Sequence, residues 1–178
     1  KYNYTPYAKN KINNISKNSF VNINKINISY IGTLRDLEIN INLIKSLKNN
    51  YKFNLYYHGD GIINKQIEKY LKDNRINNVI VTGRYQKNEE NRLYAGSDLI
   101  NVLIPNTDIN SRTLLPNRLY NSVIFGKPLI TYNGTYLAQL VTEYRLGLVI
   151  NSFDNLDKQI EHYLTNLNQD TYMNNRIK

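Results

Sequence analysis

The residues best suited to chemistry lie in the segment from Leu114 to Thr131, which reads LLPNRLYNSVIFGKPLIT. Its apolar spacing predicts a short helix that begins after Pro116 and stops at the next glycine, followed by a buried strand. Asn117 can cap the free amides of the first helical turn, and Arg118 adds a cation there. Because free N–H groups and the positive end of the helix dipole converge at this point, we predict that it holds an anion such as a phosphate. Asn121, one turn further on, is either a ligand for a sugar hydroxyl or an ordinary solvent-facing side chain.

A second candidate begins at Gly32, in the sequence Gly-Thr-Leu-Arg directly after a predicted strand. The glycine lets the backbone come close to a ligand, Thr33 can donate a hydrogen bond, and Arg35 can offer a bidentate guanidinium to a phosphate. The simpler alternative is a strand-to-helix turn with a solvated arginine.

Two further glycine turns also follow predicted strands. Gly83, Arg84 and Tyr85 together could present backbone amides and an aromatic ring to a planar base. Residues 59–61 (GDG) predict a tight turn, and we interpret His58 before them as a packed or hydrogen-bonded histidine rather than a base. Neither the dinucleotide fingerprint G-x-G-x-x-G nor the phosphate-binding loop G-x-x-x-x-G-K-[ST] occurs.

Other reaction chemistries lack their residues in this sequence. The absence of cysteine excludes disulfides and thiolate metal sites, and the two histidines, His58 and His162, lack the spacing of a metal site. No nucleophile-plus-base pairing such as G-x-S-x-G occurs. We therefore expect no metal, no cofactor and no self-contained hydrolytic site.

The elements that would position these residues alternate between strands and helices. Strands are predicted over residues 26–31, 53–57, 78–82, 98–104, 129–131 and 147–150, each followed by a helical pattern or a loop leading to one. A long polar loop is expected from Asn106 to Thr113, and a last helix begins at Asp154. Stacked strand–helix units of this kind form a parallel sheet with helices on both faces.

The predicted fold is therefore α/β, a doubly wound Rossmann-like parallel sheet of about six strands. Ligands of such folds bind outside the carboxyl ends of the strands, which selects the glycine turns and the loop before Pro116. Residues 25–178 are expected to form this domain. Residues 1–24 are polar and asparagine-rich, and we interpret them as a linker or lead-in from a missing N-terminal domain.

The net charge of +9 has two interpretations. Lysine, asparagine, isoleucine and tyrosine are abundant together, as an AT-rich coding sequence would give, so the charge indicates either compositional drift or a functional basic face. No apolar run approaches the roughly 18 residues of a membrane span, and no signal peptide is evident. We expect a cytoplasmic protein, whose basic surface could hold it at the inner face of the plasma membrane.

From Ser29 to Ile150 the chain resembles the C-terminal, nucleotide-sugar-binding domain of GT-B glycosyltransferases, in the group 1 family of bacterial cell-surface polysaccharide enzymes. Four motifs carry the resemblance over about two-thirds of the chain. They are YIGT at residues 30–33, GDG at 59–61, NV through glycine at 78–83, and LPNRLYN at 115–121 with GKP at 126–128.

The resemblance implies a UDP- or GDP-sugar donor lying across the strand ends, and transfer of a hexosyl group to a cell-surface polysaccharide or a lipid-linked acceptor. The catalytic residues it implies are Arg35 and Arg118, which would stabilise the negative charge on the leaving diphosphate. The donor-binding residues it implies are Gly32, Thr33, Gly83, Arg84, Tyr85, Leu115, Asn117 and Asn121.

The chain departs from the family pattern at two positions. Relatives usually carry a glutamate, thought to bind the ribose hydroxyls, where this chain has Asn121, and an acid near the position of Thr113. The family binds its acceptor largely through a separate N-terminal domain, so we expect this chain alone to bind nucleotide weakly and not to turn over.

Three alternatives remain open from the sequence. One is another GT-B-type enzyme such as a nucleotide-sugar epimerase, and another is a non-catalytic sugar-nucleotide sensor. The third is a basic α/β module that binds nucleic acid. The sixteen tyrosines are spread along the chain rather than gathered on one predicted sheet face, which argues against a base-stacking platform. We therefore expect no nucleic-acid partner.

Overall fold

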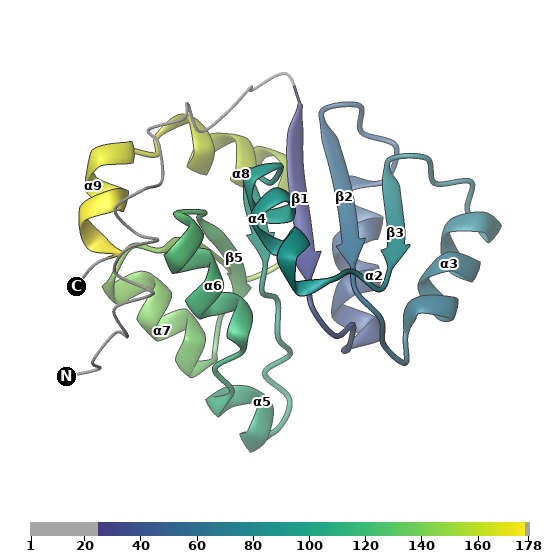
Figure 1. Cartoon of the computed structure of the whole chain (residues 1–178), viewed down its shortest axis with the longest axis horizontal. Coiled ribbons are helices and arrows are strands. Elements are labelled where there is room, and N and C mark those ends of the chain that lie inside the picture. The colour runs from purple at the N-terminus through teal and green to yellow at the C-terminus, as the bar shows by residue number, and fades with distance from the viewer. Residues whose placement is uncertain (1–24, 177–178) are drawn as a thin grey trace.

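The computed structural model describes residues 25–176 and folds them into a six-stranded, all-parallel sheet with helices on both faces (Figure 1). The strands are β1 (Ile26–Ile31), β2 (Phe53–His58), β3 (Val79–Gly83), β4 (Leu99–Asn101), β5 (Leu129–Tyr132) and β6 (Gly147–Ile150). The helices are α2 (Leu37–Leu47), α3 (Asn64–Asp73), the 3₁₀ turn η1 (Lys87–Glu89), α4 (Glu90–Ala95), α5 (Ile109–Thr113), α6 (Asn117–Phe125), α7 (Tyr136–Glu143), α8 (Leu156–Thr165) and α9 (Gln169–Asn175).

The strand order is β3-β2-β1-β4-β5-β6, which confirms the predicted doubly wound, Rossmann-like sheet. The chain moves outward from β1 to β3, then returns and moves outward from β4 to β6. The direction of winding therefore changes between β1 and β4. Loops on either side of that change diverge and leave a crevice at the carboxyl ends of the strands, where ligands of this fold bind.

The sheet separates two apolar cores. In β1, Ile26, Ile28 and Tyr30 pack on one face with α2, α3 and α8, while Ile31 packs on the other face with α4, α6 and α7. Figure 1 shows the second group of helices on the viewer's side of the sheet. This alternation follows from the period of two along a strand, and it fixes which strand-end residues face which helices.

Strand β4 is shorter than the predicted strand over residues 98–104, because a side chain breaks the ladder. The buried side chain of Asn101 accepts a hydrogen bond from the amide of Leu103 at 3.0 Å. This local bond competes with sheet pairing and turns the chain toward the crevice after three residues. Val102 still bonds the carbonyl of Ile130 at 2.9 Å, so the ladder ends gradually.

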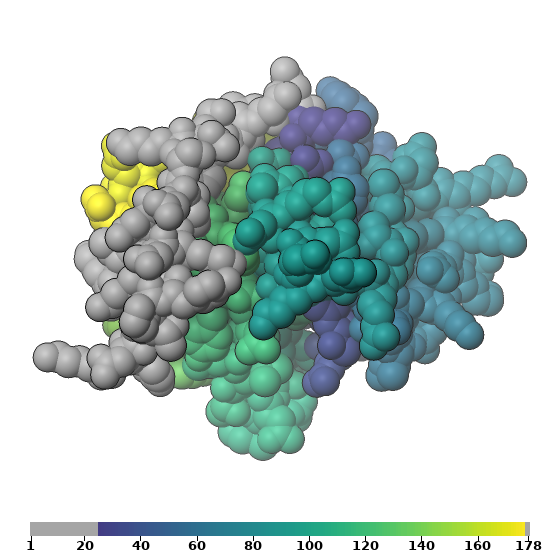
Figure 2. Space-filling model, viewed as in Figure 1, coloured from purple at the N-terminus to yellow at the C-terminus, as the bar shows by residue number. Residues whose placement is uncertain are grey.

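The expected loop from Asn106 to Thr113 is wrong in part, because it contains α5. Asp108 caps this helix, with its Oδ1 atom accepting from the amide of Ser111 at 3.0 Å and its Oδ2 atom from the hydroxyl of the same residue at 2.6 Å. The segment projects from the body as a lobe at the bottom of Figure 2. An Asp-x-x-Ser cap was readable in the sequence, but one turn of helix gives no periodic signal.

The helix α9 was not predicted, and it closes the end of α6. Gly126 ends α6 in the left-handed region at φ 65°, as expected. The guanidinium of Arg176 then donates from Nη1 to the carbonyls of Val123 at 3.0 Å and Ile124 at 3.2 Å. The predicted linker over residues 1–24 lies outside the described residues. None of the described helices is long and apolar enough to cross a membrane.

Candidate functional site

Three glycine turns interlock at the carboxyl ends of β1, β2 and β3. The amide of Gly32 bonds the carbonyl of His58 at 2.9 Å, and the amide of Gly59 bonds the carbonyl of Gly83 at 2.8 Å. A Cβ atom on Gly59 would lie 1.8 Å from the carbonyl oxygen of Gly32, far inside van der Waals contact. The second turn therefore requires glycine, and the three turns form one rigid shelf.

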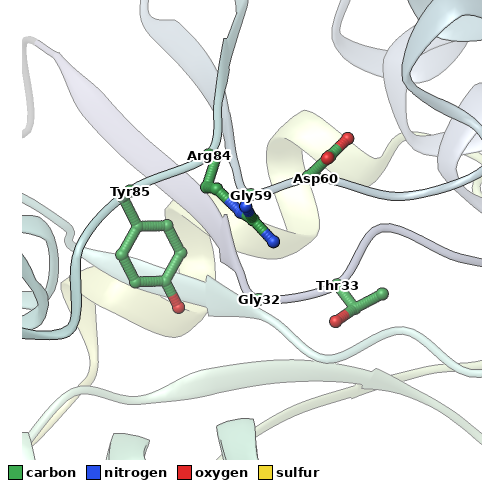
Figure 3. Close-up of a pocket in the computed structure, with 6 residues that line it drawn as sticks. All are labelled: Gly32, Thr33, Gly59, Asp60, Arg84 and Tyr85. Atoms are coloured by element: carbon green, nitrogen blue, oxygen red, sulfur yellow. The ribbon is translucent and has the colours of Figure 1, made fainter.

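This shelf forms the floor of an open pocket of about 210 Å³. In Figure 3 the Tyr85 ring stands at one side, Thr33 and Asp60 stand at the other, and the Arg84 side chain lies between them. Arg84 is exposed, and its guanidinium has no partner among residues 25–176, so it is available to an anion. The pocket is lined by Gly32, Thr33, Gly59, Asp60, Arg84 and Tyr85.

Tyr30 ties the first turn to the core beneath it. Its hydroxyl donates to the carbonyl of Thr33 at 2.8 Å and accepts from the amide of Arg35 at 3.3 Å. Its ring stacks on the ring of Tyr57, with centroids 5.9 Å apart. Both tyrosines are buried, and burial raises the pKa of the Tyr57 hydroxyl well above its usual range. The turn that carries Thr33 and Arg35 is thereby held by an aromatic pair.

Arg118 lies over the ring of Tyr30. Its guanidinium carbon is 3.6 Å from the centroid of the Tyr30 ring, a close cation–π contact. The residue is only 9% exposed, and its Nε atom has no hydrogen-bond partner among the described residues. A buried cation with an unpartnered donor at the start of a helix is strongly favoured to bind an anion.

The start of α6 differs from the sequence prediction in its cap. Pro116 is the capping residue and Asn117 is the first helical residue, so the expected side-chain cap from Asn117 is wrong. The amide of Leu119 bonds the carbonyl of Pro116 at 2.9 Å. The amides of Asn117 and Arg118 have no partner among residues 25–176, which leaves the two free donors that the anion prediction requires.

The structure brings part of the predicted set together and separates the rest. Gly32, Thr33, Arg84 and Tyr85 line the pocket, and Gly83 bonds the shelf through its carbonyl. Arg35 is exposed near Thr33, and Arg118 lies over the ring of Tyr30. Like Gly83, Arg35 and Arg118, three further predicted residues do not line the pocket. Leu115 is packed against the core beside α6, Asn117 is exposed at the helix start, and Asn121 lies beside the hydroxyl of Tyr94.

His58 is a structural residue, as interpreted from the sequence. Its Nδ1 atom lies 2.9 Å from the hydroxyl of Thr82, and its pKa is lowered by burial and by the nearby charge of Arg92. Within residues 25–176 no group of three or more His, Cys, Asp or Glu side chains is placed to hold a metal ion.

Sequence reasoning missed the tyrosines, although a signal for them was present. Tyr30 and Tyr57 each stand two positions before the glycine of a turn, at Gly32 and Gly59, and they pair across β1 and β2. The repeated Tyr-x-Gly spacing at two neighbouring strand ends could have placed two rings side by side beneath the turns.

Comparison with solved structures supports the fold. HepE of Anabaena, solved with UDP and glucose, superposes with a TM-score of 0.66 at 14% identity over 86% of this chain, which spans 42% of HepE. The catalytic domain of the cholesterol-α-glucosyltransferase of Helicobacter pylori gives 0.64 at 16% identity, covering 85% of this chain and 97% of that one. The C-terminal domain of a group 1 glycosyl transferase of Francisella tularensis gives 0.60 at 13% identity, covering 85% and 80%.

At these identities the likeness shows the fold. The chain folds like the C-terminal domain of a GT-B group 1 glycosyltransferase, as the four motifs indicated. It spans less than half of the length of HepE. No protein-family model and no curated protein matches the sequence.

Proposed function

We propose that this chain is the donor-binding domain of a glycosyltransferase, holding a nucleoside-diphosphate sugar whose sugar passes to an acceptor. The observation that carries the proposal is the buried guanidinium of Arg118, whose Nε atom is unpartnered, at the free N-terminus of α6. This anion site lies beside a glycine shelf at the winding change of the sheet. A phosphate chain and a base together need such a pair of neighbouring surfaces.

Each surface takes a different part of the ligand in this proposal. The diphosphate lies between the turn at Gly32 and Thr33 and the first amides of α6, within reach of the Arg118 and Arg35 guanidinium groups. The base lies by Arg84 and Tyr85, where the ring offers an apolar face. The solved complex of HepE with UDP favours a uracil nucleotide among the possible donors.

The chemistry of the proposed sugar transfer depends on where negative charge develops. When the bond between the sugar and the diphosphate breaks, negative charge grows on the leaving phosphate oxygen. Fixed backbone amides and arginines stabilise that charge more than the ground state, because they are preorganised and partly shielded from water. In this proposal Arg118 is held for the task by the Tyr30 ring and does not need to reorient. The acceptor is a cell-surface polysaccharide or a lipid-linked sugar, and no metal or cofactor takes part.

The test is a thermal-shift series on the 178-residue chain with UDP, GDP, CDP and ADP. Binding at 100 times Kd stabilises the folded state by about 2.7 kcal/mol, so saturating UDP should raise Tm by roughly 5 °C. The variant Arg118→Met keeps the apolar contact with Tyr30 but removes the charge, and should lose more than half of this shift. Lys72→Met removes a cation from the last turn of α3 and should keep the full shift. If none of the four nucleotides stabilises the wild type, the proposal is wrong.

We expect the 178-residue chain to bind nucleotide without transferring sugar, because the resemblance implies that a separate N-terminal domain binds most of the acceptor. Robust sugar transfer by this chain alone would contradict that expectation.

A cytoplasmic location at an anionic membrane surface is also part of the proposal, resting on the charge of +9. Sedimentation with phosphatidylserine vesicles at low salt should show binding that 0.5 M salt abolishes, and no binding at low salt would refute it.

A further inference from the structure

Glu90 stands beside the pocket and is not used by the site described above. It is the first residue of α4, and its Oε1 atom lies 3.4 Å from the hydroxyl of Tyr85, a residue that lines the pocket. This separation is longer than a full-strength hydrogen bond between oxygens, so both groups can still bond a ligand. The second carboxylate oxygen has no hydrogen-bond partner among residues 25–176.

Two other acids near the pocket each accept a hydrogen bond from the backbone of a turn. Asp60 lines the pocket, but its Oδ1 atom accepts from the amide of Gly61 at 2.9 Å and holds the second glycine turn. Glu89 accepts from the amide of Gln86 at 2.8 Å and pairs with Arg92 at 3.1 Å, which closes the capping box of η1. Of these three acids, Glu90 is the one that stands on the Tyr85 side of the pocket with a carboxylate oxygen that the described residues leave free for a ligand.

Helix α4 packs beside α6, which brings Glu90 close to residues on both helices. The ring of Tyr94 stacks on Phe125 with centroids 4.5 Å apart, and the Asn121 amide lies beside the Tyr94 hydroxyl. Burial and the nearby Glu90 carboxylate raise the pKa of the Tyr94 hydroxyl, and both also raise the pKa of the Tyr85 hydroxyl. Glu90 therefore lies next to the Tyr85 wall of the pocket and near the Tyr94 hydroxyl, beside which the Asn121 amide lies.

We infer that Glu90 binds the ribose hydroxyls of the donor nucleotide, with the Asn121 amide beside it. The inference rests on the proposed function, since the position between base wall and anion site is where a ribose must lie. A carboxylate accepts from two neighbouring hydroxyls at once, and such charge-assisted bonds are stronger than neutral ones. A site that holds a hydroxyl through buried polar groups also discriminates against the deoxy analogue.

The experiment compares UDP, 2′-deoxy-UDP and 2′,3′-dideoxy-UDP by isothermal titration calorimetry on the whole chain. The wild type should bind UDP about tenfold more tightly than the dideoxy compound. Glu90→Gln keeps the shape but weakens the acceptor, and should bring the two affinities within about threefold of each other. Glu89→Gln changes the neighbouring acid, which faces the capping box, and should keep the tenfold preference. Circular dichroism melts of each variant check that the chain remains folded.

Each outcome separates the two claims. Failure of all three nucleotides to bind the wild type overturns the proposed function together with this inference. Binding of all three with equal affinity to the wild type overturns the inference alone. Equal weakening of all three by Glu90→Gln also overturns it, because the carboxylate would then act only by positioning Tyr85.

Discussion

The two sides of the crevice are built in different ways. On the side of β1, β2 and β3, three turns are joined by backbone hydrogen bonds, and the residues beneath them are buried tyrosines. On the side of β4 and β5, the segment from Asn106 to Leu115 is a projecting lobe whose helix α5 has no buried residue. Within the described residues, side-chain bonds such as that from Asn106 to the carbonyl of Asn133 hold it to the body.

Because of this difference, we expect the first side of the crevice to keep a fixed shape and the second side to change shape easily. A backbone shelf with no room for a Cβ atom keeps its shape whether or not a ligand is bound, which is what the proposed diphosphate site needs. A single turn of helix held by exposed polar bonds opens at little expense, since few apolar contacts are lost. We therefore expect that substitutions on the first side change global stability, whereas those on the second change local opening.

The largest expected effect comes from Gly59→Ala. The new Cβ atom would meet the backbone of Gly32, which cannot rotate away, and the glycine has φ 140°. Separating the two turns should cost about 3 kcal/mol or more and lower Tm by roughly 10 °C. Gly96→Ala is the matched control, because Gly96 has φ −76° and its nearest outside atom is 3.5 Å away. A Tm for Gly59→Ala within about 2 °C of the wild type would show that the shelf is not rigid.

The second-largest expected effect comes from Asn101→Ala, which tests whether the two sides of the crevice are linked. Asn101, at the end of β4, donates from Nδ2 to the side chain of Asn40 at 3.0 Å, and Asn40 donates to the carbonyls of Arg35 and Asp36. Both asparagines are buried. Asn101→Ala orphans the Asn40 acceptor and the amide of Leu103, so it should cost about 2 kcal/mol in urea unfolding.

The same substitution should also weaken UDP binding, because the turn at Arg35 loses its support from β4. Asn110→Ala, on the exposed lobe, should change stability by less than about 0.5 kcal/mol and serves as the control. If Asn101→Ala lowers the stability of the chain but leaves its UDP affinity unchanged, the bond between Asn101 and Asn40 supports the fold and does not influence the ligand site.

The fold could be predicted from the sequence because its signals are local. Each strand is a short apolar run ending near a glycine, proline or asparagine turn, and the helices show a period near 3.6, so the parallel order followed from general topology. The predicted sheet was correct, and the structure has a pocket at the glycine turns. The helix α5 inside the expected loop was missed because one helical turn is too short to show a period.

The candidate site was less predictable because its contacts are long-range. The sequence placed a cation at Arg118 but could not show that its guanidinium lies on Tyr30, 88 positions earlier in the numbering. Asn117 fitted the statistics of helix caps, yet Pro116 takes that position because its extended backbone conformation directs the chain into the helix. Glu90 lies next to Tyr85 through the local turn before α4, but its proximity to the Tyr94 hydroxyl and Asn121 depends on the packing of α4 beside α6.

The smallest expected effect comes from Asp108→Ala, which removes the side chain that caps helix α5 in the projecting lobe. The carboxylate caps α5 through the amide and hydroxyl of Ser111, and these bonds lower the pKa of Asp108. Because the folded pKa is below the unfolded one, the stabilisation of α5 by this cap is present above the unfolded pKa and is lost as pH falls through the folded pKa.

The substitution Asp108→Ala should speed amide exchange in α5 about fivefold at pH 7, with little change in Tm and no change in the exchange of β1 or β2. As the pH falls below the unfolded pKa of about 3.9 and then through the lower folded pKa, the wild type should approach the variant, because protonation removes the capping acceptor. Ser111→Ala removes only the hydroxyl bond and should give a smaller increase in exchange. Faster exchange spreading from α5 into the glycine shelf would mean that the two sides of the crevice open together, contrary to the distinction drawn between them.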